Sequence, residues 1–421
     1  MKKVITYGTF DLLHQGHVRL LKRAKALGDY LIVGVTSDDY DRSRGKFNAA
    51  QSLMERVDAV KRLGIADEIV VEEYDGQKIE DIRRFGVDVF TVGSDWVGKF
   101  DYLKKYCKVV YLPRTEGISS SQLRAGNGSL RIGIAGKGRV ADKYRREIEF
   151  VNGLTYVGST GTLDGYRRLL KKCDAVYLQT HPRQHLRDIA LALKSGKHVL
   201  CESPITLDLD DCRRLFKMAD ERGLVLMDAI KTAYSTAYNR MLLLLQAGKI
   251  GRVVSVDATC SSLMSPCRNV KELRDLWNSR EAWAPSALMA VFQILGTSFD
   301  SCSRTSFFAP GSKTFDIFSK FDFKFADAVA TIKVAKGVKS EGELVVSGTK
   351  GYLYVPAPWW KMDYFETRFE NQEENRKYFY QLDGEGIRLT LAAFRRAVVK
   401  GLQPKISREI SELICRGVSS L

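Results

Sequence analysis

The sequence predicts an α/β fold in which two parallel, nucleotide-type sheets precede a C-terminal α+β domain with an antiparallel sheet. Short apolar runs alternate with helical patterns over residues 1–125 and again from residue 130, and this alternation predicts parallel strands joined by crossover helices. From about residue 253 the apolar runs follow one another more closely, which favours antiparallel pairing. A chain of 421 residues is too long for one ordinary core, so two or three domains are expected.

In the first series, five strands are predicted, over residues 2–10, 29–37, 67–73, 87–93 and 107–114. Four segments with helical spacing separate them, over residues 17–27, 52–64, 78–86 and 100–107. A polar, glycine-rich linker, "RAGNGS", follows at residues 124–129. Parallel sheets of this kind bind ligands beyond the carboxyl ends of their strands.

The second series has apolar stretches at residues 130–144, 154–160, 174–180, 197–203 and 224–230. The closely spaced strands that follow are expected at residues 252–261, 314–324, 328–336 and 342–355. We therefore expect three domains: a first nucleotide-type domain over 1–126, a dinucleotide-binding-type domain over 130–250 and an α+β domain over 251–421.

The amino-acid composition indicates which classes of protein and partner to expect. A hydrophobic content of 45% with 28% charged residues is typical of a globular protein. The net charge of +16 comes from basic residues spread over the chain, and no nucleic-acid motif accompanies them, so we expect anionic small molecules and not nucleic acid as partners. The eight cysteines form no CxxC pair, and no run reaches the length of a membrane span, which predicts a cytoplasmic protein with reduced thiols and no membrane insertion.

Two of the five histidines, His14 and His17, lie between the first predicted strand and the following helix. This position is the carboxyl edge of the sheet, and the N-terminus of a helix favours an anion. With Gly16 between them, both imidazoles can face one bound phosphate chain and stabilise the charge that develops at phosphorus during transfer. The alternative is a pair of partly buried structural histidines.

The segments "GTFDLLHQGH" (8–17) and "RTEGISSSQLR" (114–124) resemble the HxGH and RTxGIST-type signatures of the cytidylyltransferase family of nucleotidyltransferases. The resemblance extends over nearly all of residues 1–125, and "GSDWVGKFDYL" (93–103) is similar to the members that make CDP-glycerol. Two positions depart from that pattern. Gln15 stands where an aromatic residue is frequent, and Ser94 stands where an acid is found.

The resemblance implies a site whose catalytic residues are His14, His17, Lys46 and Arg114. The implied substrate-binding residues are Gly8, Thr9, Phe10, Asp11, Arg44, Arg56, Asp95, Trp96, Thr115, Ile118, Ser119 and Ser120. Asp11 would also contact a metal. On spacing alone, the alternative for Arg44 and Lys46 is a solvated basic loop.

The implied reaction is a transfer of CMP from CTP to a polyol phosphate, with glycerol 3-phosphate expected as the acceptor and CDP-glycerol and pyrophosphate as products. Mg²⁺ is the expected metal cofactor, because positioning and charge neutralisation carry such a transfer. The product would supply teichoic-acid-like or capsular polymer synthesis.

A second motif, "GIAGKGRVA", places Gly136, Gly138 and Ala141 in a G-x-G-x-x-A pattern after a predicted strand and before a predicted helix. This is the context of a dinucleotide fingerprint. The later stretch "CDAVYLQTHPRQHLRDIALALKSGKHVLCESPIT" resembles the Gfo/Idh/MocA family of NAD(P)-dependent oxidoreductases, and the likeness covers roughly residues 130–410. It implies dinucleotide contacts at Gly136, Gly138, Ala141, Ser159 and Glu202.

The catalytic pattern of that family is incomplete. Ser203 stands where the family has the lysine of its E-K-P motif, and Ala282 and Ser286 stand at the expected acidic and His/Tyr positions. No histidine follows His198 in the chain, so a histidine base from the C-terminal part is excluded, and a serine does not titrate near neutrality. Ser159 and Thr160 stand where an acid would hold the cofactor ribose, so Arg167 or Arg168 would favour NADP if a cofactor binds.

Other residues of this second part are candidates for lining a pocket or for acid–base chemistry. His181 and His185 are expected to line a pocket and not to catalyse. Lys231 and Tyr234 are the nearby groups that could act as acid or base.

Three hypotheses remain open. The favoured one is a cytidylyltransferase fused to an inactive oxidoreductase-like module that serves as a scaffold, dimerisation surface or sensor. The second is a bifunctional enzyme whose C-terminal half is an active NAD(P)-dependent polyol or sugar-phosphate oxidoreductase. The third is a binding protein in which both halves are inert. In each case we expect a homodimer or a larger homo-oligomer.

Overall fold

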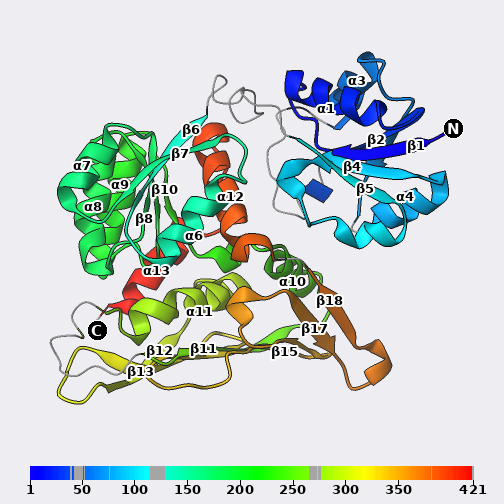
Figure 1. Cartoon of the computed structure of the whole chain (residues 1–421). Coiled ribbons are helices and arrows are strands. Elements are labelled where there is room, and N and C mark those ends of the chain that lie inside the picture. The colour runs from blue at the N-terminus through cyan, green and yellow to red at the C-terminus, as the bar shows by residue number, and fades with distance from the viewer. Residues whose placement is uncertain are drawn as a thin grey trace. The chain divides into compact units, whose positions relative to one another are not determined.

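The computed structural model describes residues 1–37, 40–41, 51, 53–74, 76–113, 129–264, 273, 276–380 and 382–419 (Figure 1). Contacts within the chain divide it into two compact units. The first comprises Met1–Ser129 with Val151–Gly153, and the second comprises Leu130–Phe150 with Leu154–Leu421. Each unit is described by itself.

The first unit is built on a five-stranded parallel sheet with the strand order β3-β2-β1-β4-β5. Its strands are β1 (Lys3–Gly8), β2 (Tyr30–Thr36), β3 (Glu68–Glu72), β4 (Val89–Gly93) and β5 (Lys108–Leu112), and its α-helices are α1 (Gln15–Lys25), α3 (Leu53–Arg62) and α4 (Gln77–Phe85). Buried side chains of α1 and α3 pack on one face of the sheet, and those of α4 pack on the other. The alternating apolar residues of the strands thus fill both faces, as the sequence predicts.

The helix predicted over residues 100–107 is wrong. The chain between β4 and β5 forms two 3₁₀ turns, η1 (Ser94–Trp96) and η2 (Asp101–Lys105). The backbone N–H of Tyr106 donates to the carbonyl of Leu103 at 2.8 Å, an i to i+3 bond. Gly98 takes a positive φ of 84° and separates the two turns.

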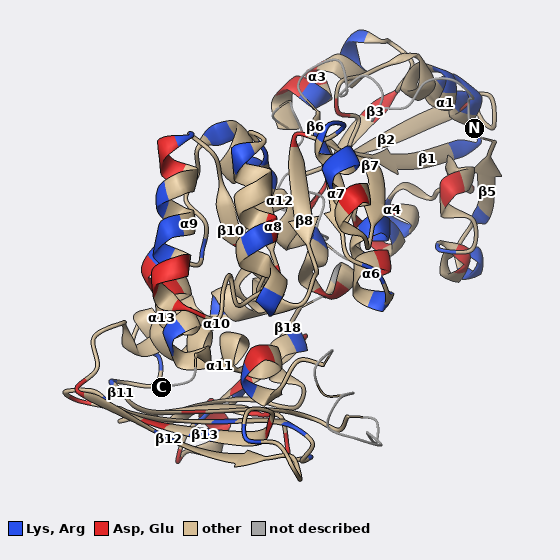
Figure 2. Ribbon diagram, turned by 90° about the vertical axis from the view of Figure 1, so that its left-hand side faces the viewer, with Lys and Arg blue, Asp and Glu red and all other residues tan. Residues whose placement is uncertain are grey.

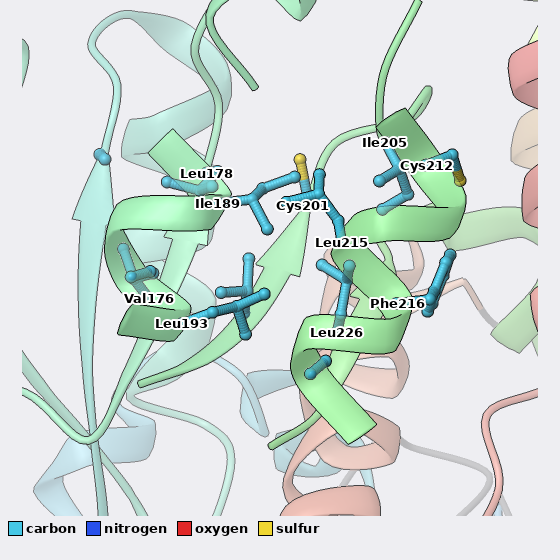
Figure 3. Packing of buried hydrophobic residues seen from close by; sticks show 14 of the residues in the cluster. Val176, Leu178, Ile189, Leu193, Cys201, Ile205, Cys212, Leu215, Phe216 and Leu226 are labelled. Carbon is cyan, nitrogen blue, oxygen red and sulfur yellow. The ribbon is translucent and has the colours of Figure 1, made fainter. Parts of the chain in front are cut away.

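The second unit begins with a parallel sheet of strand order β10-β9-β8-β6-β7. Its strands are β6 (Leu130–Ala135), β7 (Leu154–Thr160), β8 (Ala175–Leu178), β9 (His198–Cys201) and β10 (Leu226–Asp228), and its helices are α6 (Arg139–Ile148), α7 (Leu163–Leu170), α8 (Pro182–Lys194) and α9 (Leu209–Glu221). Figure 3 shows Ile189 and Leu193 of α8 packed beside Leu215 of α9 over the strands. The strand–helix alternation predicted from residue 130 is confirmed.

The second sheet of this unit has eight strands in the order β12-β13-β14-β11-β15-β16-β17-β18. The strands are β11 (Val253–Ser262), β12 (Ser301–Phe308), β13 (Asp316–Lys324), β14 (Val329–Lys336), β15 (Leu344–Gly348), β16 (Tyr352–Val355), β17 (Tyr364–Arg368) and β18 (Arg376–Phe379). The helices are α10 (Thr236–Gln246), α11 (Ser279–Leu295), α12 (Ile387–Lys400) and α13 (Arg408–Val418), with short turns η3 (Lys231–Tyr234), η5 (Trp359–Lys361), η6 (Gln372–Glu374) and η7 (Asp383–Gly386).

The antiparallel sheet expected for this domain is confirmed for all of its strand pairs but one. β11 pairs in parallel with β14, while its other neighbour, β15, is antiparallel. The long connection that carries α11 between β11 and β12 allows the parallel pairing, because parallel strands need a crossover. The sequence analysis also missed β12, β17 and β18, whose outward faces are polar or exposed.

Charge on this unit is mixed. Figure 2 shows basic and acidic residues interspersed along α9 and α7. Within the described part of the chain, no helix is long and apolar enough to cross a membrane.

Candidate active site

The first candidate site lies at the carboxyl end of β1, the central strand of the first sheet. β1 pairs with β2 on one side and with β4 on the other, so the chain order reverses around it. Open α/β sheets bind ligands at such a switch point. The segment Gly8–His17 begins exactly at this edge.

The loop that follows β1 is fixed by its own contacts. Phe10 and Leu12 have positive φ values of 52° and 46°, a conformation that is rare outside glycine. The backbone N–H of Leu12 donates to Gln51 Oε1 at 2.9 Å, and that of Gln51 donates to Asp11 Oδ1 at 3.1 Å. A Cβ atom on Gly8 would lie 3.1 Å from the buried Phe10 ring. Strain held in this way is characteristic of functional loops.

His14 and His17 lie together at the N-terminus of α1. His14 caps the helix, and its Nδ1 accepts a hydrogen bond from the backbone N–H of Gly16 at 3.0 Å. An accepting Nδ1 is unprotonated, so the neutral ring carries its proton on Nε2, where it can be donated. The His17 ring stacks on the His14 ring with centroids 3.9 Å apart, and the Phe10 ring meets His17 edge-on at 5.5 Å. The first turn of α1 has no acidic residue, which leaves its dipole available to an anion.

Arg56, which is expected to contact the substrate, is held by backbone carbonyl groups. Its side chain is fully buried, and its Nη1 donates to the carbonyl oxygens of Thr9 at 2.7 Å and Thr36 at 2.8 Å. Thr9 Oγ1 in turn donates to Asp41 Oδ2 at 2.9 Å. A buried guanidinium engaged with backbone carbonyls positions the ends of β1 and β2, and contact of Arg56 with the substrate stays a prediction.

Asp95 and Trp96 belong to the turn η1 that follows β4, at the same edge of the sheet. Asp95 is exposed, and Trp96 is half-buried. The Trp96 ring lies 5.8 Å from the Phe100 ring and 5.0 Å from Lys99 Nζ. The structure thus places both residues beside the end of β1.

Seven predicted site residues lie outside the described residues, and their structure is not discussed: Arg44, Lys46, Arg114, Thr115, Ile118, Ser119 and Ser120.

The sequence analysis missed a buried polar group at the same edge of the sheet. Lys78 of α4 forms an ion pair with Glu72, the last residue of β3, and Thr36 Oγ1 donates to Glu72 Oε2 at 2.9 Å. The Tyr7 hydroxyl donates to Asp81 Oδ2 at 2.8 Å, and burial together with Asp81 raises the pKa of Tyr7. Each of Tyr7, Thr36 and Glu72 lies at the carboxyl end of an otherwise apolar strand, and this common position is the signal that was available.

The second candidate site is the turn after β6. Gly136 and Gly138 have φ values of 146° and 98°, and Gly138 precedes the first residue of α6. A Cβ atom on Gly136 would lie 2.7 Å from the carbonyl oxygen of Gln179, so only glycine fits there. Ala141 is buried where α6 meets the sheet. This is the strand–turn–helix geometry of a dinucleotide fingerprint.

At the end of β7, exposed Ser159 is followed by Thr160, Gly161 and Thr162, and none of them is acidic. A Cβ atom on Gly161 would lie 2.6 Å from Lys137 Cδ, so the lysine side chain covers this strand end. A basic side chain at this position suits a phosphate on the ribose better than a free ribose diol.

Polar groups at the ends of β9 and β10 are buried. The Tyr177 hydroxyl donates to Glu202 Oε1 at 2.5 Å, and burial raises the pKa of Glu202. Ser203 is buried. Asp228 accepts a hydrogen bond from the Ser411 hydroxyl, and burial raises the pKa of Asp228 to about 6.

The histidines of this unit are engaged by backbone groups. His181 caps α8, and its Nδ1 accepts from the N–H of Arg183 at 3.3 Å. His185 is fully buried, with its ring nitrogens 2.8 Å and 2.9 Å from the carbonyl oxygens of Pro204 and Thr180. Desolvation lowers the pKa of His185, which makes it a structural residue.

Comparison with known proteins supports the two-part organisation. Residues 5–126 match the family described as cytidylyltransferase-like. A glycerol-3-phosphate cytidylyltransferase of Bacillus spizizenii is 49% identical over 130 residues, which is 31% of this chain and 100% of that protein. Its namesakes in Bacillus subtilis and Staphylococcus aureus are 51% and 45% identical over 124 residues, covering 95% and 93% of their lengths and 30% of this chain.

The second unit is similar to other proteins. Residues 139–229 match the Gfo/Idh/MocA model, described as an oxidoreductase family with an NAD-binding Rossmann fold. A 3-ketoreductase from Actinomadura kijaniata, solved with NADP and TDP-benzene, aligns with a TM-score of 0.59 at 19% identity over 69% of this chain and 95% of that one. A levoglucosan dehydrogenase aligns with a TM-score of 0.58 at 16% identity, over 69% and 96% of the two chains. These likenesses establish the fold of the second unit.

The paired rings of His14 and His17 and the near-complete coverage of three relatives agree with the family match of the first unit. The chain therefore belongs to the cytidylyltransferase-like family through residues 5–126, and it carries in addition an oxidoreductase domain of the Gfo/Idh/MocA family.

Proposed function

We propose that this chain is a nucleotidyltransferase that transfers CMP from CTP to glycerol 3-phosphate. A phosphate oxygen of the acceptor attacks the α-phosphorus of CTP, the bond from that phosphorus to the bridging oxygen of the β-phosphate breaks, and pyrophosphate leaves with CDP-glycerol as the other product. The observation that carries this proposal is the stacked pair His14 and His17 at the N-terminus of α1, in a segment about 50% identical to proteins named for this activity.

The geometry supports definite roles. His14 donates from Nε2 because its Nδ1 is occupied by the N–H of Gly16, and the stacked His17 ring lies beside it. Both imidazole rings would stabilise the negative charge that develops at the α-phosphate in the transition state. We propose from the sequence that seven further residues close over the triphosphate: Lys46, Arg44, Arg114, Thr115, Ile118, Ser119 and Ser120.

Mg²⁺ fits this site on the chemistry of the donors. Mg²⁺ is usually held by one or two carboxylates together with substrate phosphates and water. Among the described residues no cluster of three metal-ligating side chains exists, and Asp11 supplies a carboxylate in the loop beside the histidines. Asp11 would hold the ion, which supplies charge neutralisation of the triphosphate when bound.

The test is product formation by the full chain. With CTP, glycerol 3-phosphate and Mg²⁺ we expect pyrophosphate release and CDP-glycerol, and little of either with ATP. Release with ATP but not with CTP would contradict the proposal. Release only with another polyol phosphate would retain the reaction class and change the acceptor.

We propose that the second unit binds NADP or NAD and does not oxidise or reduce a substrate. The turn of Gly136 and Gly138 and the basic Lys137 support dinucleotide binding, whereas Ser203, Ala282 and Ser286 offer no proton acceptor. The second candidate function is a bifunctional enzyme. Lys231 favours it, because this lysine lies near Glu202 and burial lowers its pKa.

The remaining expectations are proposals as well. We propose a homodimer or larger homo-oligomer acting in the cytoplasm in teichoic-acid-like or capsular polymer synthesis, with functional divisions at 1–126, 130–250 and 251–421. Light scattering at micromolar concentration measures the oligomeric state, and a monomer would contradict that part of the proposal.

A further inference from the structure

The second unit contains a group of charged side chains that the proposed cytidylyl transfer does not use. Lys143 of α6, Lys231 of η3 and Lys361 of η5 surround the carboxylate of Glu385, which lies in η7 just before α12. Lys143 pairs with Glu385 Oε1. Lys361 Nζ and Lys231 Nζ lie 3.2 Å and 3.7 Å from Oε2 of the same carboxylate. We call Lys143, Lys231 and Lys361 the lysine cluster.

The lysine cluster carries more positive charge than its neighbours balance. Glu202 also acts on Lys231, so three ammonium groups face two carboxylates. Burial lowers the pKa of Lys231, and Lys361 and Lys143 lower it further. Burial raises the pKa of Glu385, but its bonds to Lys143 and Lys361 outweigh this effect, and the pKa falls to about 2. Glu385 therefore remains ionised at every physiological pH.

A single carboxylate matches this cluster poorly. Its two oxygens serve three ammonium groups, and Lys231 is left at 3.7 Å, beyond the length of a hydrogen bond. A phosphate monoester carries up to two charges and presents three terminal oxygens, which matches three ammonium donors in both charge and number.

The backbone that presents Glu385 is strained. Glu385 has φ 53° and ψ 30° and stands between Gly384 at φ 60° and Gly386 at φ 80°. A residue other than glycine rarely adopts this left-handed region. A Cβ atom on Gly384 would collide with the Glu147 carboxylate of α6, so the turn is pressed against that helix. The fold thus holds an unfavourable conformation that brings a carboxylate into the lysine cluster, a kind of strain that accompanies ligand-responsive segments.

The cluster is open to solvent. The side chains of Lys143, Lys231 and Lys361 are 22%, 27% and 40% exposed, and that of Glu385 is 33% exposed. A small anion can therefore reach the ammonium groups if the Glu385 side chain turns away.

We propose that Lys143, Lys231 and Lys361 form a binding site for a phosphate monoester in the second unit, and that Glu385 is an internal carboxylate that occupies this site until the ligand displaces it. The site is separate from the transferase site of residues 1–126 and needs neither cytidylyl transfer nor hydride transfer. Its ligand shares its chemistry with the proposed acceptor, so the second unit would sense phosphorylated small molecules.

Titration calorimetry on the full chain tests the proposal with inorganic phosphate, glycerol 3-phosphate and uncharged glycerol as probes. Glu385→Gln removes the competing charge and should tighten phosphate binding about tenfold, because the unliganded site is then no longer occupied. Lys361→Met and Lys231→Met should each weaken it about tenfold, the cost of one hydrogen bond to a charged group. Glycerol should not bind to the lysine cluster. Binding of glycerol 3-phosphate that is tighter than that of inorganic phosphate and that Lys361→Met weakens would identify an organic monoester as the ligand.

Lys217→Met is the matched control, since Lys217 is 76% exposed on α9 and pairs with Glu221 at 3.9 Å. Phosphate affinity that is the same in Glu385→Gln, Lys361→Met and Lys217→Met would overturn the proposal. Pyrophosphate release from CTP is measured on each variant and should stay unchanged, so a failure of the transferase proposal is seen separately.

Discussion

At the scale of single residues, the position of a proton follows from one hydrogen bond. The Gly16 N–H occupies Nδ1 of His14, which fixes the tautomer with its proton on Nε2. The sequence places two histidines at the start of α1, but it does not show which nitrogen donates, because that depends on the backbone of the helix cap. The stacking of His17 on His14 makes the pair one structural group.

We expect His17→Ala to lower turnover about 10²–10³-fold, the range for loss of one preorganised donor to a transition-state charge. The fold should survive, since His17 is half-buried and not part of an apolar core. Pyrophosphate release under saturating CTP measures turnover, and circular dichroism measures folding. Lys22→Ala, an exposed position on the same helix, is the control and should stay near the wild-type rate. A folded His17→Ala protein with normal turnover would refute the assigned role.

Arg56 gives a second prediction at this scale. Arg56→Met leaves the buried carbonyl oxygens of Thr9 and Thr36 without their donor, and we expect the first unit to lose about 2–4 kcal/mol of unfolding free energy. Denaturant unfolding measures this loss against Arg62→Met, an exposed arginine of the same helix. If Arg56→Met raised the KM for CTP at unchanged stability, direct substrate contact would be the better assignment.

At the scale of elements, the sequence predicts those strands and helices whose positions depend on the local pattern of apolar residues. The strands of the first sheet carry continuous apolar runs and were found within a few residues of their ends. The spacing of residues 100–107 predicts an α-helix, but the chain forms the 3₁₀ turn Asp101–Lys105 there, because apolar spacing alone does not distinguish the two over so short a segment. The parallel pairing of β11 with β14 was missed because a strand pattern carries no information on which partner it meets.

Distant elements also create buried groups that no local pattern reveals. Asp228 ends β10 and accepts from Ser411 of α13, a contact between residues 183 positions apart. Burial raises the pKa of Asp228 from its ordinary value to about 6. The unfolded chain therefore releases this proton at a lower pH than the folded chain, so the contribution of Asp228 to stability is complete below about pH 4 and is lost as the pH rises to about 6.

We expect Asp228→Asn to remove this pH dependence. The difference in unfolding free energy between the variant and the wild type should shift by up to about 3 kcal/mol in favour of the variant between pH 4 and pH 7, because two pKa units correspond to that energy. Thermal unfolding across this pH range gives the measurement. Asp210→Asn, at a position 86% exposed on α9, should show no such shift. A constant difference for Asp228→Asn would mean that folding does not raise the pKa of this carboxyl.

At the scale of the whole molecule, one chain joins two units, and we propose a phosphate-binding site in each of them. The first unit offers an anion the N-terminus of α1 and two histidines. The second offers the glycine turn after β6 and the lysine cluster around Glu385. The sequence revealed both families through their strand-end motifs. It did not reveal the lysine cluster, because the three lysines and the Glu385 that they surround come from four separate segments between residues 143 and 385.

We expect no hydride transfer by the whole chain. Oxidation of a polyol carbon needs a base for the hydroxyl proton, and loss of one such group typically costs about 10²–10⁴-fold in rate. Ser203 is buried and not titratable, no histidine follows His198, and Lys231 is engaged with Glu385 in the lysine cluster. We therefore expect no change in reduced-nicotinamide absorbance when the chain is mixed with NAD or NADP and free or phosphorylated polyols, even where cofactor binding is detected by calorimetry.

A Gly136→Ala variant should lose that binding, since its Cβ would lie 2.7 Å from the Gln179 carbonyl. A steady absorbance change that Lys231→Met abolishes and Lys217→Met leaves intact would instead establish the second unit as a working oxidoreductase with Lys231 as its proton acceptor.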